Sequence, residues 1–279
     1  MDTSQKSVAV VIPVYQSVNQ LANTVSELMN TIESSTELKD LNYKLNKVIL
    51  VDDGSTDGSN KVISELILNP VITSITLNRN YGQHAAIFAG VLSTNEDVII
   101  TMDEDGEHDP LIIPEMIRKI EKDQFEIIYA KFKYKKTDLK ELSSVYAKKF
   151  IGSISRDPNI KYISSYRAVK GTIFRSAAVY ANNGSFLDVA LGWISRKVST
   201  VETTKRTTQR KSTYSFRGLV NHFSKLFFAA GIKPLIFLFN LGWVVSLGSL
   251  IAILIIIYRK VFSSIPVQGC WSDLFLVVG

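Results

Sequence analysis

Short apolar runs alternate with longer segments of helical periodicity over the first half of the chain. The apolar runs cover 8–12, 47–51, 72–77, 97–102 and 125–131. Nearly continuous runs of this kind are typical of strands buried on both faces of a parallel sheet. Helical spacing falls between them, at about 18–32, 58–67, 83–93 and 111–122. This alternation predicts an α/β fold, a doubly wound and mostly parallel sheet with helices on both faces.

The alternation of apolar runs with helical spacing becomes less regular after Lys131. A late strand is predicted at 163–169, helices at 172–180 and 187–196, and an extended segment at 197–203. Two further segments, 139–154 and 216–230, mix apolar and basic residues at helical spacing. Amphipathic basic helices of this kind lie in the plane of a membrane surface, and we expect both segments to do so.

A long uncharged segment, Leu235–Tyr258, follows. Its length of about 24 residues is enough to cross a bilayer, and a buried helix of a soluble protein is the alternative. A second apolar run begins at Trp271 and stops at Gly279, so we expect the sequence to end inside a second span. The predicted organisation is therefore a catalytic domain at 1–215, a juxtamembrane helix at 216–233 and a transmembrane region at 234–279.

Composition and charge place the domain beside a membrane. The hydrophobic content of 46% excludes a disordered chain, and the net charge of +6 is concentrated in residues 196–233. A basic cluster next to an apolar span is typical of an anionic membrane face; nucleic-acid binding is the competing interpretation, and we expect no nucleic acid. Cys270 is the only cysteine, which fits a reducing compartment. With a polar N-terminus and no signal peptide, the positive-inside rule predicts a domain on the cytoplasmic face.

Acidic residues follow two of the predicted strands. Asp103-Glu104-Asp105 comes directly after 97–102, and Asp52-Asp53 follows 47–51. Ligands bind beyond the carboxyl ends of such strands. Two carboxylates two residues apart can hold a hard divalent cation that also binds phosphate, although a solvated acidic loop would show the same spacing. An ordinary strand-to-helix turn would explain Gly54 and Ser55 but not the doubled aspartate.

A third polar segment, Asn78-Arg79-Asn80-Tyr81-Gly82-Gln83-His84, follows the third strand. Arg79 can pair with a phosphate or with an acidic cluster, and a solvated loop is an equal alternative. His108 lies near the acidic motif and can line the site, although lone histidines are more often structural.

Four motifs in order carry a family resemblance. They are Val11-Ile12-Pro13-Val14-Tyr15, Val51-Asp52-Asp53-Gly54-Ser55-Thr56-Asp57, Asn78-Arg79-Asn80-Tyr81-Gly82-Gln83 and Met102-Asp103-Glu104-Asp105. The chain resembles the family-two inverting glycosyltransferases, and within them the dolichol-phosphate mannose synthase and bacterial polyprenyl-phosphate glycosyltransferase branch. The resemblance covers essentially the whole chain and implies a GT-A (Rossmann-like) fold with C-terminal transmembrane helices.

The resemblance also implies a donor site. Asp103 would bind near the ribose and diphosphate, and Asp105 would ligate Mg²⁺ or Mn²⁺. Relatives often have Gln where this chain has Glu107, so a carboxylate would replace an amide at the metal. The implied contacts to the nucleotide sugar are Pro13, Tyr15, Asp52, Asp53, Arg79, Gln83, Asp103 and Glu104.

The acceptor half departs from the family pattern. Ser164-Ser165-Tyr166-Arg167 falls where many relatives have Gly-Asp-Phe-Arg, so Ser165 replaces an aspartate. Arg167 would meet the acceptor phosphate, since a planar guanidinium suits phosphate. Asp188 is a second-choice acidic catalytic residue. A basic stretch that precedes the membrane helices would contact the acceptor phosphate or stay solvated: Arg206, Arg210, Ser212 and Tyr214.

The implied reaction is a single inverting displacement, in which an acceptor phosphate attacks a nucleotide sugar, UDP-linked or GDP-linked. Three alternatives stay open: an enzyme of the same fold that extends a glycan or another lipid, a non-catalytic membrane scaffold, and a dinucleotide oxidoreductase. The oxidoreductase would need Gly-x-Gly-x-x-Gly after the first strand, where this chain has Pro13-Val14-Tyr15-Gln16-Ser17. The expected partners are the nucleotide sugar, a polyprenyl phosphate and the membrane, with a homo-oligomer left open.

Overall fold

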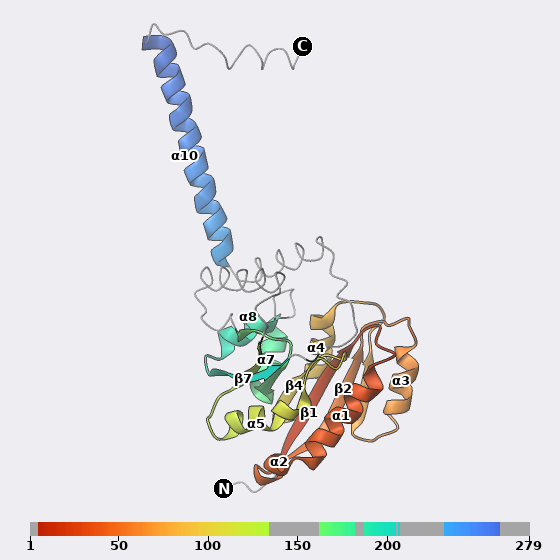
Figure 1. Cartoon of the computed structure of the whole chain (residues 1–279). Helices are drawn as coiled ribbons and strands as arrows, with labels where there is room; N and C mark the ends of the chain where they lie inside the picture. The colour runs from red at the N-terminus through yellow and green to blue at the C-terminus, as the bar shows by residue number, and fades with distance from the viewer. Residues whose placement is uncertain (1–4, 134–161, 182–186, 205, 207–231, 263–279) are drawn as a thin grey trace. The chain divides into compact units, whose positions relative to one another are not determined.

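The computed structural model describes residues 5–133, 162–181, 187–204, 206 and 232–262 (Figure 1). The chain divides into two compact units, Met1–Ala229 and Ala230–Gly279. The first contains the sheet, and the second contains one long helix.

The first unit is built on a seven-stranded sheet with the order β3-β2-β1-β4-β6-β5-β7. The strands are β1 (Lys6–Val14), β2 (Tyr43–Asp52), β3 (Ile72–Thr76), β4 (Val98–Thr101), β5 (Ile127–Lys133), β6 (Arg167–Lys170) and β7 (Val198–Thr204). All described pairings are parallel except those of β6, which runs against both β4 and β5. The predicted mostly parallel sheet is therefore confirmed, with one reversed strand inserted near its middle.

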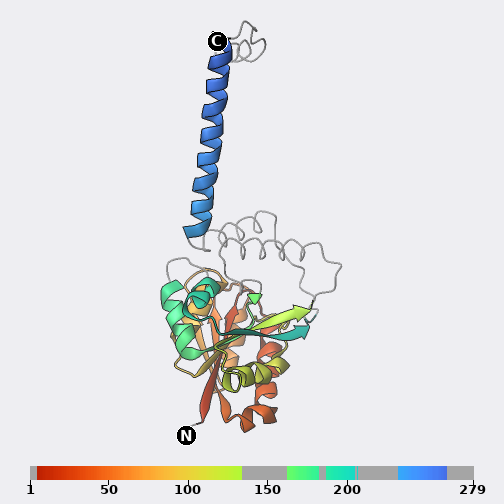
Figure 2. The same cartoon turned by 90° about the vertical axis from the view of Figure 1, so that its left-hand side faces the viewer.

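Helices cover both faces of this sheet (Figures 1 and 2). One face packs against α1 (Leu21–Ser34), α2 (Thr36–Asp40), α3 (Ser59–Leu66) and α5 (Ile113–Glu121). The other packs against α4 (Gln83–Leu92), α7 (Gly171–Tyr180) and α8 (Leu187–Ile194). The sheet thus forms the middle of three layers, as the alternating pattern predicts.

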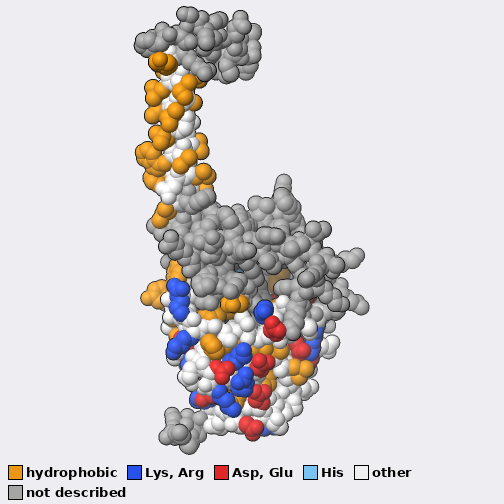
Figure 3. Space-filling model, turned by 60° about the vertical axis from the view of Figure 1, so that its left-hand side comes forward, with side chains coloured by type: hydrophobic (Ala, Val, Ile, Leu, Met, Phe, Trp, Pro, Cys, Tyr) orange, Lys and Arg blue, Asp and Glu red, His pale blue; other side chains and the backbone are white. Residues whose placement is uncertain are grey.

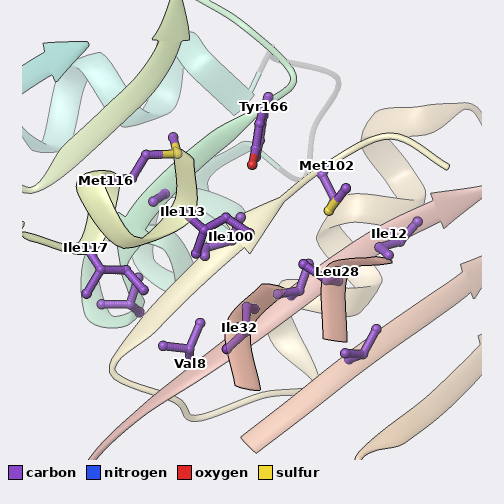
Figure 4. Packing of buried hydrophobic residues seen from close by; sticks show 14 of the residues in the cluster. Val8, Ile12, Leu28, Ile32, Ile100, Met102, Ile113, Met116, Ile117 and Tyr166 are labelled. Carbon is purple, nitrogen blue, oxygen red and sulfur yellow. The ribbon is translucent and has the colours of Figure 1, made fainter. Parts of the chain in front are cut away.

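The burial of alternate side chains explains the two hydrophobic cores. In β1, Val8, Val10 and Ile12 point into the first core, whereas Ala9 and Val11 point into the second. Successive strand side chains face opposite sides, so a strand covered on both faces has to be apolar throughout. In the first core, residues of α1 and α5 pack on β1 and β4 (Figure 4): Val8, Ile12, Leu28, Ile32, Ile100, Met102, Ile113, Met116, Ile117 and Tyr166.

Local sequence explains how α5 begins. A 3-10 turn, η1 (Pro110–Ile112), precedes it, and the Asp109 carboxylate caps this turn by accepting a hydrogen bond from the Leu111 N–H at 3.0 Å. The predicted single helix at 111–122 is therefore split into η1 and α5, because Pro110 and the Asp109 cap favour a tight first turn. The short helix α2 was not predicted.

The second unit contains α10 (Ile232–Phe262), whose segment Leu238–Tyr258 has a mean hydropathy of 2.4. This segment has 21 residues and is not buried, and hydrophobic side chains cover the helix (Figure 3). By length and composition α10 can cross a bilayer, since about 20 apolar residues span the hydrocarbon core. The segments 139–154 and 216–230 and the second apolar run lie outside the described residues.

Candidate active site

The carboxyl edge of the parallel strands gathers the polar motifs. Val14 and Asp52 pair in register at the ends of β1 and β2, and Thr101 ends β4 immediately before the acidic motif. Parallel strands end at one edge, so residues far apart in sequence meet there. The edge thus brings together Asp52-Asp53, the loop before α4 and Asp103-Glu104-Asp105.

The Asp53 carboxylate joins two of these motifs. It is 2% exposed and accepts hydrogen bonds from the backbone N–H groups of Tyr81, at 2.7 Å, and Gly82, at 2.8 Å. Hydrogen bonds to an ionised carboxylate are the stronger kind, so Asp53 fixes the loop that leads into α4. Asp52 is equally buried and accepts from the Ser55 N–H at 2.9 Å, which closes the turn after β2.

Gly54 lets the loop after β2 approach the loop between β3 and α4. Its φ is +73°, and a Cβ there would lie 2.7 Å from the carbonyl carbon of Arg79.

We expect Gly54→Ala to lower the free energy of unfolding by about 2 kcal/mol or more, because the strain of a left-handed backbone and the clash with the backbone of Arg79 add. Gly58→Ala is the matched control: its φ is +97°, but the nearest atom would be 3.9 Å away. Denaturant unfolding of both variants measures the difference, and equal losses would contradict the close approach.

The Asp103 carboxylate receives hydrogen bonds at both oxygens. Oδ1 accepts from the Gln83 side-chain amide at the start of α4, and Oδ2 accepts from the Ser165 hydroxyl at 2.9 Å. The His108 Nε2 lies 3.5 Å from Oδ2, while Nδ1 of the same ring accepts the Asp103 N–H at 2.9 Å. Since Nδ1 accepts, a neutral His108 carries its proton on Nε2, toward the carboxylate.

His108 is held by aromatic neighbours. Its ring is 4% exposed and stacks on Tyr166, with centroids 4.8 Å apart, and on Phe132, at 5.5 Å. The Tyr166 hydroxyl donates to the Asp109 carbonyl at 2.8 Å, and its burial raises the pKa of that phenol well above the ordinary value. The histidine near the acidic motif therefore has both a packing role and a polar contact with Asp103.

Asp105 has the chemistry of a cation ligand. It is half-buried, and burial raises the pKa of its carboxyl, with repulsion from Glu107 and Asp103 adding to the effect. The Glu107 N–H donates to Asp105 Oδ1 at 3.0 Å, which opposes the shift. A divalent cation would relieve the repulsion, so the residues present fit Mg²⁺ or Mn²⁺. No group of three or more acidic, histidine or cysteine side chains converges as a metal site among the described residues.

Arg167, at the start of β6, and Asp188, on α8, form a buried ion pair. Arg167 is 1% exposed and Asp188 7%, and the guanidinium NH1 donates to Asp188 Oδ1. Tyr129 also donates to Oδ1, at 3.0 Å, and Arg167 Nε donates to the Thr101 hydroxyl at 3.2 Å. The predicted contact of Arg167 with an acceptor phosphate stays a prediction.

Arg206 is likewise paired. Its guanidinium bonds to Glu27 on α1 and to Asp109 Oδ1, at 2.8 Å, and its N–H donates to the Glu107 carbonyl at 3.3 Å. The residue therefore ties the chain after β7 to the acidic loop. Arg210, Ser212 and Tyr214 lie outside the described residues, so their predicted acceptor contacts stay predictions.

The remaining predicted donor contacts surround this edge. Pro13 is buried near the end of β1, and Tyr15 beyond it is 41% exposed. Arg79 is exposed and lies over the Tyr81 ring, 4.8 Å from its centroid. The backbone carbonyl of Glu104 accepts from the Thr24 hydroxyl at 3.0 Å. The structure thus places Pro13 within β1 and puts Tyr15, Arg79 and Glu104 in the loops that follow β1, β3 and β4.

Sequence reasoning missed Ser165 as a partner of Asp103 and gave no role to Thr101 or Tyr129. A signal existed for Ser165, because a small hydroxyl residue stands where the family resemblance leads one to expect an acid. For Thr101 and Tyr129 there was none, since both lie in apolar strands where one polar side chain does not disturb the pattern.

A three-layer α/β fold with acidic and polar motifs along one sheet edge is the arrangement expected of a GT-A-type glycosyltransferase. Residues 9–181, more than half of the chain, match the model of "Glycosyl transferase family 2". The chain belongs to this family, and the expected resemblance is confirmed.

Two relatives match over nearly the whole chain. One, from Proteus mirabilis (strain HI4320), is 30% identical over 100% of this chain and 86% of its own length. The other, from Photorhabdus laumondii subsp. laumondii, is 29% identical over 98% of this chain and 85% of its own length. Both are named undecaprenyl-phosphate 4-deoxy-4-formamido-L-arabinose transferase.

Solved structures share the fold. Glucosyl-3-phosphoglycerate synthase from Mycobacterium tuberculosis, in complex with Mn²⁺, UDP and glucosyl-3-phosphoglycerate, aligns with a TM-score of 0.56 at 12% identity, over 82% of this chain and 80% of that one. Mannosyl-3-phosphoglycerate synthase from Rubrobacter xylanophilus aligns with a TM-score of 0.59 at 13% identity, over 81% and 72%. At this identity the likeness supports the GT-A fold.

Proposed function

We propose that this glycosyltransferase moves a sugar from a nucleotide sugar to undecaprenyl phosphate, with inversion at the anomeric carbon. The observation that carries the proposal is the match, over nearly the whole chain, to two relatives named as undecaprenyl-phosphate sugar transferases. The apolar helix α10 supports it, because an enzyme that uses a lipid phosphate works at a membrane. We place the catalytic domain on the cytoplasmic face.

In this proposal the acidic cluster binds the nucleotide-sugar donor. Asp103, oriented at both oxygens, would bind near the ribose and diphosphate, and Asp105 with Glu107 would hold Mg²⁺ or Mn²⁺. Mg²⁺ commonly takes one or two protein carboxylates and completes its shell with water and substrate phosphates, so two carboxylates are enough. When bound, the cation neutralises charge on the departing diphosphate. UDP is the proposed nucleotide, with GDP as the alternative.

The bond changes are simple. An oxygen of the acceptor phosphate forms a bond to the anomeric carbon as the bond from that carbon to the donor's diphosphate oxygen breaks. The electron pair of the broken bond leaves with the nucleoside diphosphate. The attacking phosphate is already ionised near neutral pH, so the step needs no strong general base.

We expect the purified full-length chain to transfer label from a UDP-sugar to undecaprenyl phosphate in the presence of Mg²⁺ or Mn²⁺. Extraction of the lipid product into organic solvent measures transfer, and undecaprenol, which lacks the phosphate, is the matched control acceptor. No lipid-linked sugar from any UDP or GDP donor would overturn the proposal. Transfer to a glycan would instead support the same-fold alternative, and a chain with no metal-dependent UDP affinity would support the scaffold.

A further inference from the structure

Ser165 occupies an unusual place beside the donor site. Its hydroxyl donates to Asp103 Oδ2 at 2.9 Å, while the Gln83 amide holds Oδ1. Gln83 sits at the exposed start of α4, whereas Ser165 directly precedes the buried residues Tyr166 and Arg167. Of the two donors, Ser165 is therefore attached to the more buried part of the fold.

A hydrogen bond from β4 holds the backbone of Ser165. Its carbonyl accepts a hydrogen bond from the Thr101 hydroxyl at 2.6 Å, and Thr101 is fully buried. The same hydroxyl accepts from Arg167 Nε at 3.2 Å, and Arg167 bonds to Asp188 on α8. A continuous chain of hydrogen bonds thus leads from α8 through β6 and β4 to the acidic motif.

We propose that Ser165 is a positioning residue: its hydroxyl holds the Asp103 carboxylate in the orientation that binds the donor, and Thr101 anchors it to the buried Arg167–Asp188 pair. The inference rests on the proposed donor role of Asp103. An ionised carboxylate in place of the Ser165 hydroxyl could not donate to Asp103 Oδ2 and would repel it at this distance, so the serine of this chain allows a contact that the aspartate of many relatives does not.

We expect Ser165→Ala to raise the donor KM and weaken Mn²⁺-dependent UDP binding by roughly 10- to 100-fold, the range for losing a hydrogen bond to a charged group. Ser165→Thr retains a hydroxyl and should recover most of the affinity. Ser165→Asp should bind UDP more weakly than the alanine variant. Ser176→Ala is the matched control, because this exposed serine also makes one hydrogen bond of 2.9 Å, on α7, and should bind UDP like the unmodified chain.

Titration calorimetry with UDP and Mn²⁺, donor KM and melting temperature, all on the full chain, separate the outcomes. Weakened binding at an unchanged melting temperature, with rescue by threonine, supports the inference. Unmodified affinity in Ser165→Ala overturns it, as does turnover in Ser165→Asp equal to or above that of the unmodified chain. Asp103→Asn tests the underlying proposal. If Asp103→Asn binds UDP like the unmodified chain, the donor role of Asp103 is wrong. If Asp103→Asn loses UDP binding but Ser165→Ala keeps it, only the role of Ser165 is wrong.

Discussion

Asparagine in place of Asp105 is expected to lower turnover by roughly 100- to 1,000-fold while leaving the fold intact. The substitution removes the charge that would hold the cation, yet the amide oxygen can still accept the Glu107 N–H. The test compares kcat of the variant with that of the unmodified chain at saturating donor and Mn²⁺. Unmodified turnover would remove Asp105 from the mechanism.

The same substitution has a predictable effect on stability. Burial raises the folded-state pKa of Asp105 above its unfolded value, so ionisation costs the folded state free energy. Stability from this group therefore falls as pH rises from the unfolded pKa through the folded pKa. Asparagine removes the cost, and at pH 7 without added metal the variant should melt no lower than the unmodified chain. Asp40→Asn, an exposed position on α2, is the matched control and should change neither turnover nor melting.

The second large effect is expected at Asp188. Asp188→Asn should lower the free energy of unfolding by about 3 kcal/mol or more, because Arg167 keeps a buried charge without a counter-charge. Denaturant unfolding in detergent measures the loss. Replacing both partners, as Arg167→Met with Asp188→Leu, should recover much of it, since removing a buried pair costs less than breaking one.

An exposed ion pair on the same sheet provides the comparison. Lys131 and Glu202 lie 3.0 Å apart on β5 and β7, and both side chains are about half exposed. Glu202→Gln should cost less than about 1 kcal/mol, the usual value of a surface pair. If Asp188→Asn were no more destabilising than Glu202→Gln, the Arg167–Asp188 pair would not be buried in solution.

Most of the sheet, and the edge at which the acidic motifs lie, could be predicted from the sequence. The runs at 8–12, 47–51 and 97–102 are apolar on both faces, which only a strand covered by two helix layers requires, and each ends near residues of the site. Because the carboxyl ends of parallel strands share an edge, the placement of Asp53 and Asp103 at one edge followed from their positions after two predicted parallel strands.

The surroundings of Arg167 and Ser165 could not be predicted in the same way. The pattern at 163–169 indicates a strand but not its direction, which depends on where the preceding chain returns to the sheet. Arg167 pairs with Asp188 on another element, and a local pattern carries no information about a partner fixed by tertiary packing. The hydroxyl contact of Ser165 has the same origin, because it depends on the reversed direction of β6.

The reversal of β6 also determines where the chain between β5 and β6 meets the sheet. β5 ends at Lys133 and β6 begins at Arg167, and both points lie at the carboxyl edge, so the chain between them leaves and re-enters the sheet on the same side. A parallel strand in this place would instead require the chain to cross back to the opposite edge of the sheet before the strand began. The reversed direction of β6 therefore brings Arg167 and the preceding Ser165 to the edge that carries Asp103.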